Sequence, residues 1–220
     1  MSAGGGTAVA AVIFDLDGVL VDTEPTHLAA TRALIAPAEI TLQQYERFIG
    51  RGGFKQWLEA TYDIPRAVID ARYGTLFYEE LEGAPLRPLD GAVELLDAVR
   101  ERKLGLAVAS QSSPAWVAAT LRSCGLAERF ALVVTAEEAG RDKPAPDIYL
   151  HTARLLDAAP ARCIAVEDSV HGLASASAAG MRVVQLRQAS FTPPPQAAAH
   201  AVIERWRDFD LRWLDGEPLG

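Results

Sequence analysis

Cysteines are scarce in this sequence, and long hydrophobic runs are missing. The 220 residues include only two cysteines, Cys124 and Cys163, which lie far apart and form no Cys-x-x-Cys pair. We therefore expect two buried free thiols in a reducing compartment. No apolar stretch has the length needed to cross a bilayer, and residues 1–6 lack the basic and apolar segments of a secretory signal. The sequence predicts a cytoplasmic protein that has no membrane partner.

Positive charge is also in short supply. Lysine and arginine total 21 against 29 aspartate and glutamate residues, which gives a formal charge of -8, and the basic residues are scattered along the chain. This pattern argues against nucleic acid as a partner. An anionic substrate would need local help from a metal ion or from a few well-placed cations. The oligomeric state stays open between a monomer and a weak homo-oligomer.

The first strong feature is an apolar run that ends in two acids. Residues 9–14 have the character of a fully buried strand, and Asp15 and Asp17 follow directly, with Gly18 after them. Acids at the carboxyl end of a central parallel strand face the crevice where open α/β sheets bind ligands. The alternative, for this pair taken alone, is a solvated turn in which Gly18 supplies the unusual backbone angles.

The rest of the chain alternates in a way that predicts an α/β fold with an insert. Residues 24–85 contain helical patterns without strands, whereas helix and strand alternate from Leu89 onward. We predict a Rossmann-like, doubly wound parallel sheet formed by residues 1–23 and 86–220, and an all-helical cap domain formed by residues 24–85. Predicted helices of the cap span 25–35, 42–49, 54–62 and 65–81. Predicted later strands span 104–109, 131–135, 163–166 and 182–186, and 191–195 is expected to be a loop.

Four motifs in order resemble those of a known family. Residues 15–23, Asp-Leu-Asp-Gly-Val-Leu-Val-Asp-Thr, resemble the first motif of the haloacid dehalogenase-like hydrolases, in the branch with a helical cap that includes sugar-phosphate phosphatases and β-phosphoglucomutase. Residues 108–112, 143–149 and 167–169 are similar to the family's second, third and fourth motifs. Without the resemblance, Ser110 would be interpreted as a turn residue and Lys143 as a surface residue.

The resemblance implies a catalytic set for hydrolysis of a small phosphorylated metabolite. Asp15 would attack phosphorus and form an aspartyl-phosphate, and Asp17 would act as general acid and then as general base. Ser110 would bind a phosphoryl oxygen with help from the amide of Gln111. Lys143 would neutralise the nucleophile and the transferring group.

The resemblance also implies Mg²⁺ as cofactor. Two predicted strands end in acids, and carboxylates from neighbouring strand ends form an oxygen-rich site that suits a hard cation. Asp15, Asp168 and the backbone carbonyl of Asp17 would be ligands. Glu167 would act through a water molecule or from behind the direct ligands.

Substrate contacts are expected from the cap. The glycine-rich segment 50–55 contains two cations, Arg51 and Lys55, at the place of the family's specificity loop. A flexible connection with solvated charges is the competing interpretation. His27 lies on the first predicted helix, where it could support the reaction or pack at a hinge.

Two other functions deserve comparison with the phosphatase. A β-phosphoglucomutase has the same core, but Ser113 and Pro114 stand where its core lysine is expected, and Gly53 stands near the place of its cap arginine. Both departures favour a phosphatase over a mutase. A non-catalytic phosphoryl-binding or regulatory protein on the same scaffold is the alternative from another class.

Overall fold

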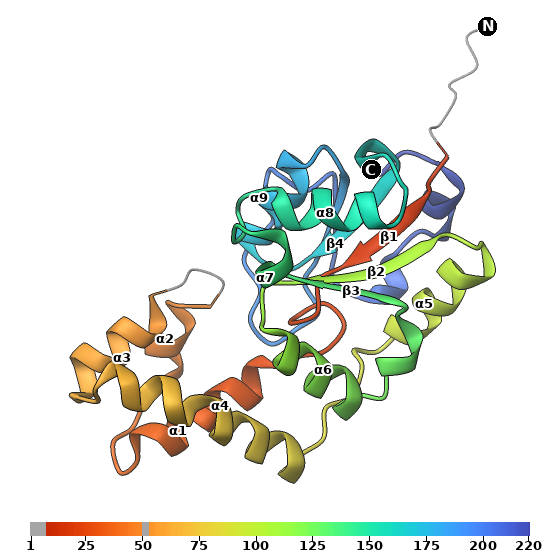
Figure 1. Ribbon diagram of the computed structural model, residues 1–220. Coiled ribbons are helices and arrows are strands. Elements are labelled where there is room, and N and C mark those ends of the chain that lie inside the picture. The colour runs from red at the N-terminus through yellow and green to blue at the C-terminus, as the bar shows by residue number, and fades with distance from the viewer. Residues whose placement is uncertain (1–7, 50–52) are drawn as a thin grey trace, which may run out of the picture.

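A six-stranded parallel sheet forms the centre of the protein. The computed structural model describes residues 8–49 and 53–220, and within them the sheet has the order β3-β2-β1-β4-β5-β6. This is the predicted Rossmann-like, doubly wound architecture (Figure 1). The strands are β1 (Ala11–Phe14), β2 (Gly105–Ser110), β3 (Leu132–Thr135), β4 (Cys163–Glu167), β5 (Arg182–Leu186) and β6 (Ala201–Ile203). Of these, only the short edge strand β6 was not predicted.

Helices cover both faces of the sheet, which explains why β1 is apolar throughout. Val12 and Phe14 pack on one face against α5 (Ala92–Glu101) and α6 (Pro114–Ser123). Ala11 and Ile13 point to the other face, which is covered by α8 (Asp147–Leu155) and α9 (Val170–Ala178). Alternate residues of a strand point to opposite faces, so a strand that is buried on both sides cannot alternate with polar residues.

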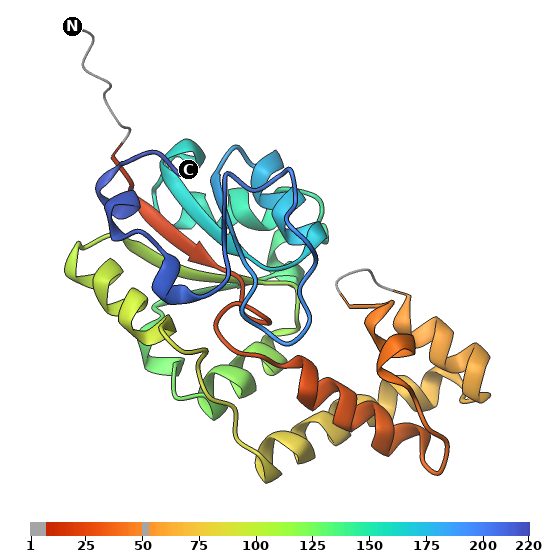
Figure 2. The same cartoon turned by 180° about the vertical axis from the view of Figure 1, so that it is seen from behind.

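Between β1 and α5 the chain forms four helices that stand beside the sheet. They are α1 (Glu24–Ile35), α2 (Leu42–Glu46), α3 (Phe54–Tyr62) and α4 (Arg66–Gly83). These helices have a small core of their own around Leu28, Leu58 and Ile69. The views from front and back both show them as a separate layer that the chain enters through α1 and leaves through α4 (Figures 1 and 2). The four helices lie within residues 24–85, and their role as a cap domain stays a prediction.

Two helix ends differ from the expected ones. α2 ends at Glu46 rather than at Ile49, and the chain continues in a turn. α4 begins after Pro65, whose backbone is extended (ψ 137°), and it runs on to Gly83. A proline ring fixes φ but leaves ψ free, so proline can precede a first turn as well as occupy it. A short helix that was not predicted, α7 (Ala136–Ala139), follows β3.

The two cysteines have the predicted environment. Cys124 and Cys163 are buried and neither forms a disulfide. Burial raises the pKa of each thiol to about 11. None of the helices in residues 8–49 and 53–220 is long and apolar enough to span a bilayer.

Candidate active site

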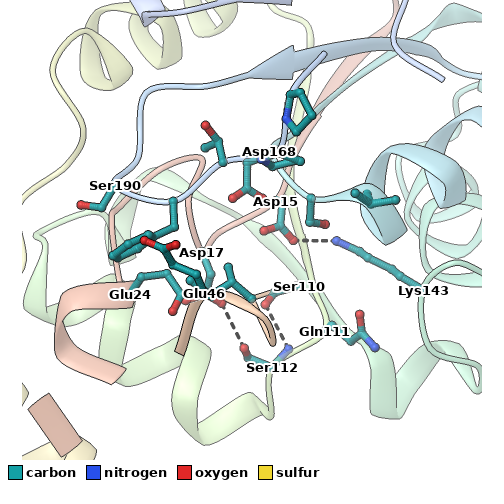
Figure 3. Close-up of a pocket in the computed structure, with 17 residues that line it drawn as sticks. Asp15, Asp17, Glu24, Glu46, Ser110, Gln111, Ser112, Lys143, Asp168 and Ser190 are labelled. Carbon is teal, nitrogen blue, oxygen red and sulfur yellow. Dashed lines mark hydrogen bonds and ion pairs between the residues drawn. The ribbon is translucent and has the colours of Figure 1, made fainter. Parts of the chain in front are cut away.

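Polar side chains meet at the carboxyl ends of the central strands. Phe14 pairs with Val108 of β2 and with Val166 of β4, so the residues that follow it lie level with the ends of both neighbours. The amide of Asp15 continues the sheet by donating to the carbonyl of Val166 (3.0 Å). Asp15 and Ser110 thereby face one cavity of about 550 Å³, which also receives side chains from the helical insert (Figure 3).

Lys143 is buried at the base of this cavity. Its ammonium donates hydrogen bonds to Asp15 Oδ1 (2.6 Å), to Glu167 Oε1 (2.6 Å) and to the carbonyl of Ala109 (3.1 Å). Three partners use all three donors of the group. Burial alone would lower the pKa of Lys143, but the two carboxylates outweigh it and raise the pKa above its ordinary value. Lys143 is therefore a fixed cation next to Asp15.

Glu167 is the inner partner that holds Lys143. Its side chain is fully buried, and Oε1 also accepts a hydrogen bond from the hydroxyl of Tyr149 (2.6 Å). The other oxygen, Oε2, accepts from the amide of Asp168 (3.2 Å) and from the hydroxyl of Ser169 (3.2 Å). Tyr149 belongs to the lysine motif of the sequence, but its contact with Glu167 was not predicted.

Three carboxylates form a site that could bind a cation. One oxygen each from Asp15, Glu167 and Asp168 lie within 4.8 Å of one another. Burial raises the pKa of Asp15 to about 8, although Lys143 opposes the shift, and burial with the neighbouring acids raises the pKa of Asp168 well above its ordinary value. Crowded buried carboxylates of this kind favour a compensating positive charge. An all-oxygen donor set fits a hard cation such as Mg²⁺.

Gly18 allows the first acidic turn to approach the second. Its φ of +80° is one that side chains disfavour, and a Cβ built on it would lie 2.0 Å from Asp168 Oδ2. The glycine is therefore needed both for the turn and for the space in which Asp168 lies. No other residue type fits this position without moving Asp168.

Asp17 has a different environment from Asp15. Its Oδ1 accepts a hydrogen bond from the hydroxyl of Thr23 (2.7 Å). Its Oδ2 accepts one from the hydroxyl of Ser112 (3.0 Å) (Figure 3). Thr23 directly precedes α1 and Ser112 follows β2, so both oxygens of the carboxylate are held by separate segments of the chain. The sequence analysis identified Asp17 but neither of its hydroxyl partners.

Ser110 and Gln111 line the same cavity at the end of β2. Ser110 is buried, and its hydroxyl oxygen accepts a hydrogen bond from the amide of Ser112 (3.2 Å). Gln111 is exposed at the cavity wall. The structure thus brings these two residues together with Asp15 and Lys143, as the sequence led us to expect.

The two expected cap residues that the structure describes, Lys55 and His27, do not line this cavity. Lys55 forms an ion pair with Asp70 (2.7 Å) and lines a separate cavity. Arg51 lies outside the residues that the structure describes. His27 lines the same separate cavity as Lys55 rather than the one that contains Asp15.

His27 is part of an aromatic cluster between the insert and the core. Its ring lies 4.6 Å from that of Trp116 on α6 and 4.7 Å from that of Phe77 on α4, and Nδ1 lies 3.1 Å from the hydroxyl of Tyr73. Burial lowers the pKa of His27 to about 4, although Asp17 opposes the shift. The neutral imidazole therefore packs where the insert meets the core.

We expect this histidine to make the protein sensitive to acid. Its pKa is 6.5 in the unfolded chain and about 4 in the folded one, so the unfolded state binds the proton more tightly and stability falls as the pH drops through that window. Between pH 7 and pH 5 the wild type should lose roughly 2 kcal/mol more than His27→Gln. Urea unfolding followed by circular dichroism at both pH values would measure the difference. An identical pH dependence in both proteins would contradict the assignment.

The segment 191–195, which the sequence predicted as a loop without a role, contributes to one wall of the cavity. Residues 190–194 line it, and Asp22 fixes the loop by accepting a hydrogen bond from the amide of Ser190 (2.9 Å). The buried amide of Gln185 donates to the carbonyls of Pro193 (3.3 Å) and Pro194 (3.2 Å). The three consecutive prolines, Pro193 to Pro195, were the only sequence signal of this wall.

Comparison with known proteins gives a consistent picture. A family model described as haloacid dehalogenase-like hydrolase matches residues 9–180. The chain is 33% identical to the fructose-1-phosphate phosphatase YqaB of Escherichia coli (81% of this chain, 96% of the other), and 30% identical to β-phosphoglucomutase of Bacillus subtilis (94% of each). The crystal structure of CbbY from Rhodobacter sphaeroides in complex with phosphate has a TM-score of 0.80 and 26% identity, over 91% of this chain and 96% of that one.

Proposed function

The chain belongs to the haloacid dehalogenase-like hydrolases and is a phosphatase of that family, and from this premise we propose that it hydrolyses a small sugar phosphate with Mg²⁺ through an aspartyl-phosphate at Asp15. The observation that carries the proposal is the position of Asp15. It lies in the cavity, next to a buried lysine and within a cluster of three carboxylates. A nucleophile that must approach an anionic phosphate needs positive charge beside it.

Asp15 is the proposed nucleophile. One of its oxygens would form the bond to phosphorus while the bond to the leaving oxygen breaks. Lys143 contacts Oδ1 at 2.6 Å and would offset the charge that the carboxylate and the phosphoryl group share. Ser110, at the adjacent strand end, would donate to a phosphoryl oxygen.

Asp17 is the proposed proton donor and acceptor. It would protonate the leaving alcohol in the first half of the reaction and accept a proton from water in the second. The hydroxyls of Thr23 and Ser112 bind its two oxygens, so they would fix the direction in which the carboxyl group points. The same group can serve both steps because hydrolysis of the acyl-phosphate reverses its proton transfer.

Asp15 and Asp168 are the proposed direct ligands of Mg²⁺, together with the backbone carbonyl of Asp17. When bound, the ion would supply positive charge that offsets the repulsion between carboxylates and phosphate. Glu167 would act from behind these ligands, because Lys143, Tyr149 and the following turn already use its oxygens.

The proposal can be tested by phosphate release from a panel of substrates. Sugar phosphates, phosphoglycolate, nucleotides and β-glucose 1-phosphate would be assayed with Mg²⁺ and with a chelator. We expect release that requires the metal and that is fastest with sugar phosphates. Release that persists in the chelator would refute the metal assignment, and silence across the panel would refute the phosphatase.

A mutase is the second candidate because of the similarity to β-phosphoglucomutase over 94% of the chain. The place expected for a core lysine is taken by Ser113, which accepts a hydrogen bond from the amide of Trp116 (3.4 Å) as the N-cap of α6, and by Pro114, which opens that helix. Neither side chain offers a cation for a second phosphate. Conversion of β-glucose 1-phosphate to glucose 6-phosphate without phosphate release would favour the mutase.

A further inference from the structure

The cavity has two chemically different ends. Asp15, Lys143 and Ser110 form the end where the phosphoryl group would react. Glu24 of α1 and Glu46 of α2 lie together on the side away from Lys143, next to Asp17 (Figure 3). The leaving group of a substrate would point toward this second end, because the proton donor Asp17 stands between the two.

None of the described residues at the second end carries a positive charge. Lys143 is the one cation among the described residues that line the cavity, and both Asp15 and Glu167 already pair with it. Lys55, the cation predicted to contact substrate, pairs with Asp70 and lines the other cavity. Among the described residues of the cavity, a second phosphate or a carboxylate on the substrate would therefore meet acids rather than a counter-charge.

The second end is nevertheless suited to hydroxyl groups. Glu24 Oε2 accepts a hydrogen bond from Tyr45 (2.5 Å), while Oε1 forms no bond to any residue that the structure describes. The ring of Tyr45 in turn contacts that of Phe191 from the core loop, with centroids 6.3 Å apart. A fixed carboxyl group beside an aromatic ring offers hydrogen bonds to a polyol and an apolar surface to its carbon chain.

Glu46 differs from Glu24 in a way that makes it the better test of charge. Burial raises the pKa of Glu24 to about 7, so near neutral pH this group is only partly ionised. Glu46 is exposed, makes no ion pair with the described residues, and lines the cavity. A change at Glu46 therefore alters the charge of the wall without breaking a contact that supports the fold.

We infer that this phosphatase selects phosphate monoesters whose leaving alcohol is an uncharged polyol, and that Glu46 is a specificity-determining residue that disfavours substrates with a second anionic group. The inference rests on the proposed function. Glu46 is exposed, so solvent screens its charge, and a like charge a few ångströms away then changes binding several-fold, by roughly 1 kcal/mol or less. The carboxylate of Glu46 would exert that effect on an anionic leaving group and leave a neutral one unaffected.

Two matched substrate pairs would test the inference. Sorbitol 6-phosphate and 6-phosphogluconate are both open-chain and differ in the carboxylate at C1, and fructose 1-phosphate and fructose 1,6-bisphosphate differ by one phosphate. We expect kcat/KM of the wild type to favour the first member of each pair by about tenfold or more. Glu46→Gln should reduce that preference several-fold, and Glu46→Lys should reduce it by a similar factor again, because each step changes the charge by one unit.

A control with the same change of charge is available on the same insert. Glu39 is exposed and lines neither cavity, so Glu39→Lys should leave the preference unchanged. The inference is overturned if the wild type handles the anionic members equally well, or if Glu46→Lys and Glu39→Lys have the same preference. A preference for the bisphosphate that Arg51→Ala removes would also overturn it. No release from any of the four substrates would overturn the proposed function, and this inference with it.

Discussion

Asp15→Asn is expected to abolish turnover and leave the fold intact. The amide is nearly isosteric but is not a nucleophile toward phosphorus, so kcat should fall by at least about 10⁴-fold, as it does when a covalent catalyst is removed. Asparagine can still accept the hydrogen bond from Lys143, and Glu167 still pairs with that lysine, so the fold should remain intact. Phosphate release and thermal unfolding of both proteins would measure the two effects.

The intermediate itself offers a second measurement. Wild-type protein that is quenched in acid during turnover should contain a phosphorylated Asp15, which peptide mass spectrometry can locate, and Asp15→Asn should contain none. Asp97→Asn serves as the matched control, because Asp97 is an exposed carboxylate that pairs with Arg129 far from the cavity. Full turnover in Asp15→Asn would refute the assignment of the nucleophile.

Lys143→Met is expected to lose both stability and activity. Methionine retains an unbranched apolar stem, but the buried carboxylates of Asp15 and Glu167 lose the ammonium that lies 2.6 Å from each. Removing one partner of a buried ion pair typically destabilises by about 3–5 kcal/mol. The activity should fall by at least about 10²-fold, because the transferring group loses its fixed positive charge. Urea unfolding and steady-state kinetics would report the two losses.

The double variant Lys143→Met/Glu167→Gln separates these effects. Glutamine still accepts the hydrogen bond from Tyr149 but carries no charge, so part of the lost stability should return. Activity should not return, because the cation beside Asp15 is still absent. Equal stability of Lys143→Met and the wild type would show that the ammonium does not compensate the two carboxylates.

Much of the fold could be predicted because its signals are local and repeated. The uninterrupted apolar run before Asp15 identified a strand that is buried on both faces, and the strand span at 182–186 matches β5. β6 was missed because Ala201–Ile203 is too short to show a period, and it pairs with β5 only through tertiary contact. The end of α2 was misplaced because the apolar residues after Glu46 continue the helical pattern while the backbone turns.

The residues of the site were likewise predictable only in part. Asp15, Ser110, Glu167 and Asp168 stand at or directly after strand ends, and the register of parallel strands brings strand ends level. Lys143 lies in the loop before α8 and was predicted from its motif. Tyr149 and Ser112 act through hydrogen bonds between separate segments, and Thr23 acts across the turn that contains Asp17, which the spacing along the chain did not reveal. The substrate contact of Lys55 stays a prediction, and the sequence did not show its ion pair with Asp70, because a charge in the sequence does not reveal its partner.

The central place of β1 has a consequence for synthesis of the protein. Its sheet neighbours begin at Gly105 and Cys163, so no sheet hydrogen bond of this strand can form until those segments have left the ribosome. The insert, complete at Gly83, emerges first and can collapse on its own small core. Pairing that joins residues so distant in the chain is slow to form. The strand that delivers the nucleophile is thus made before the strands that fix its position.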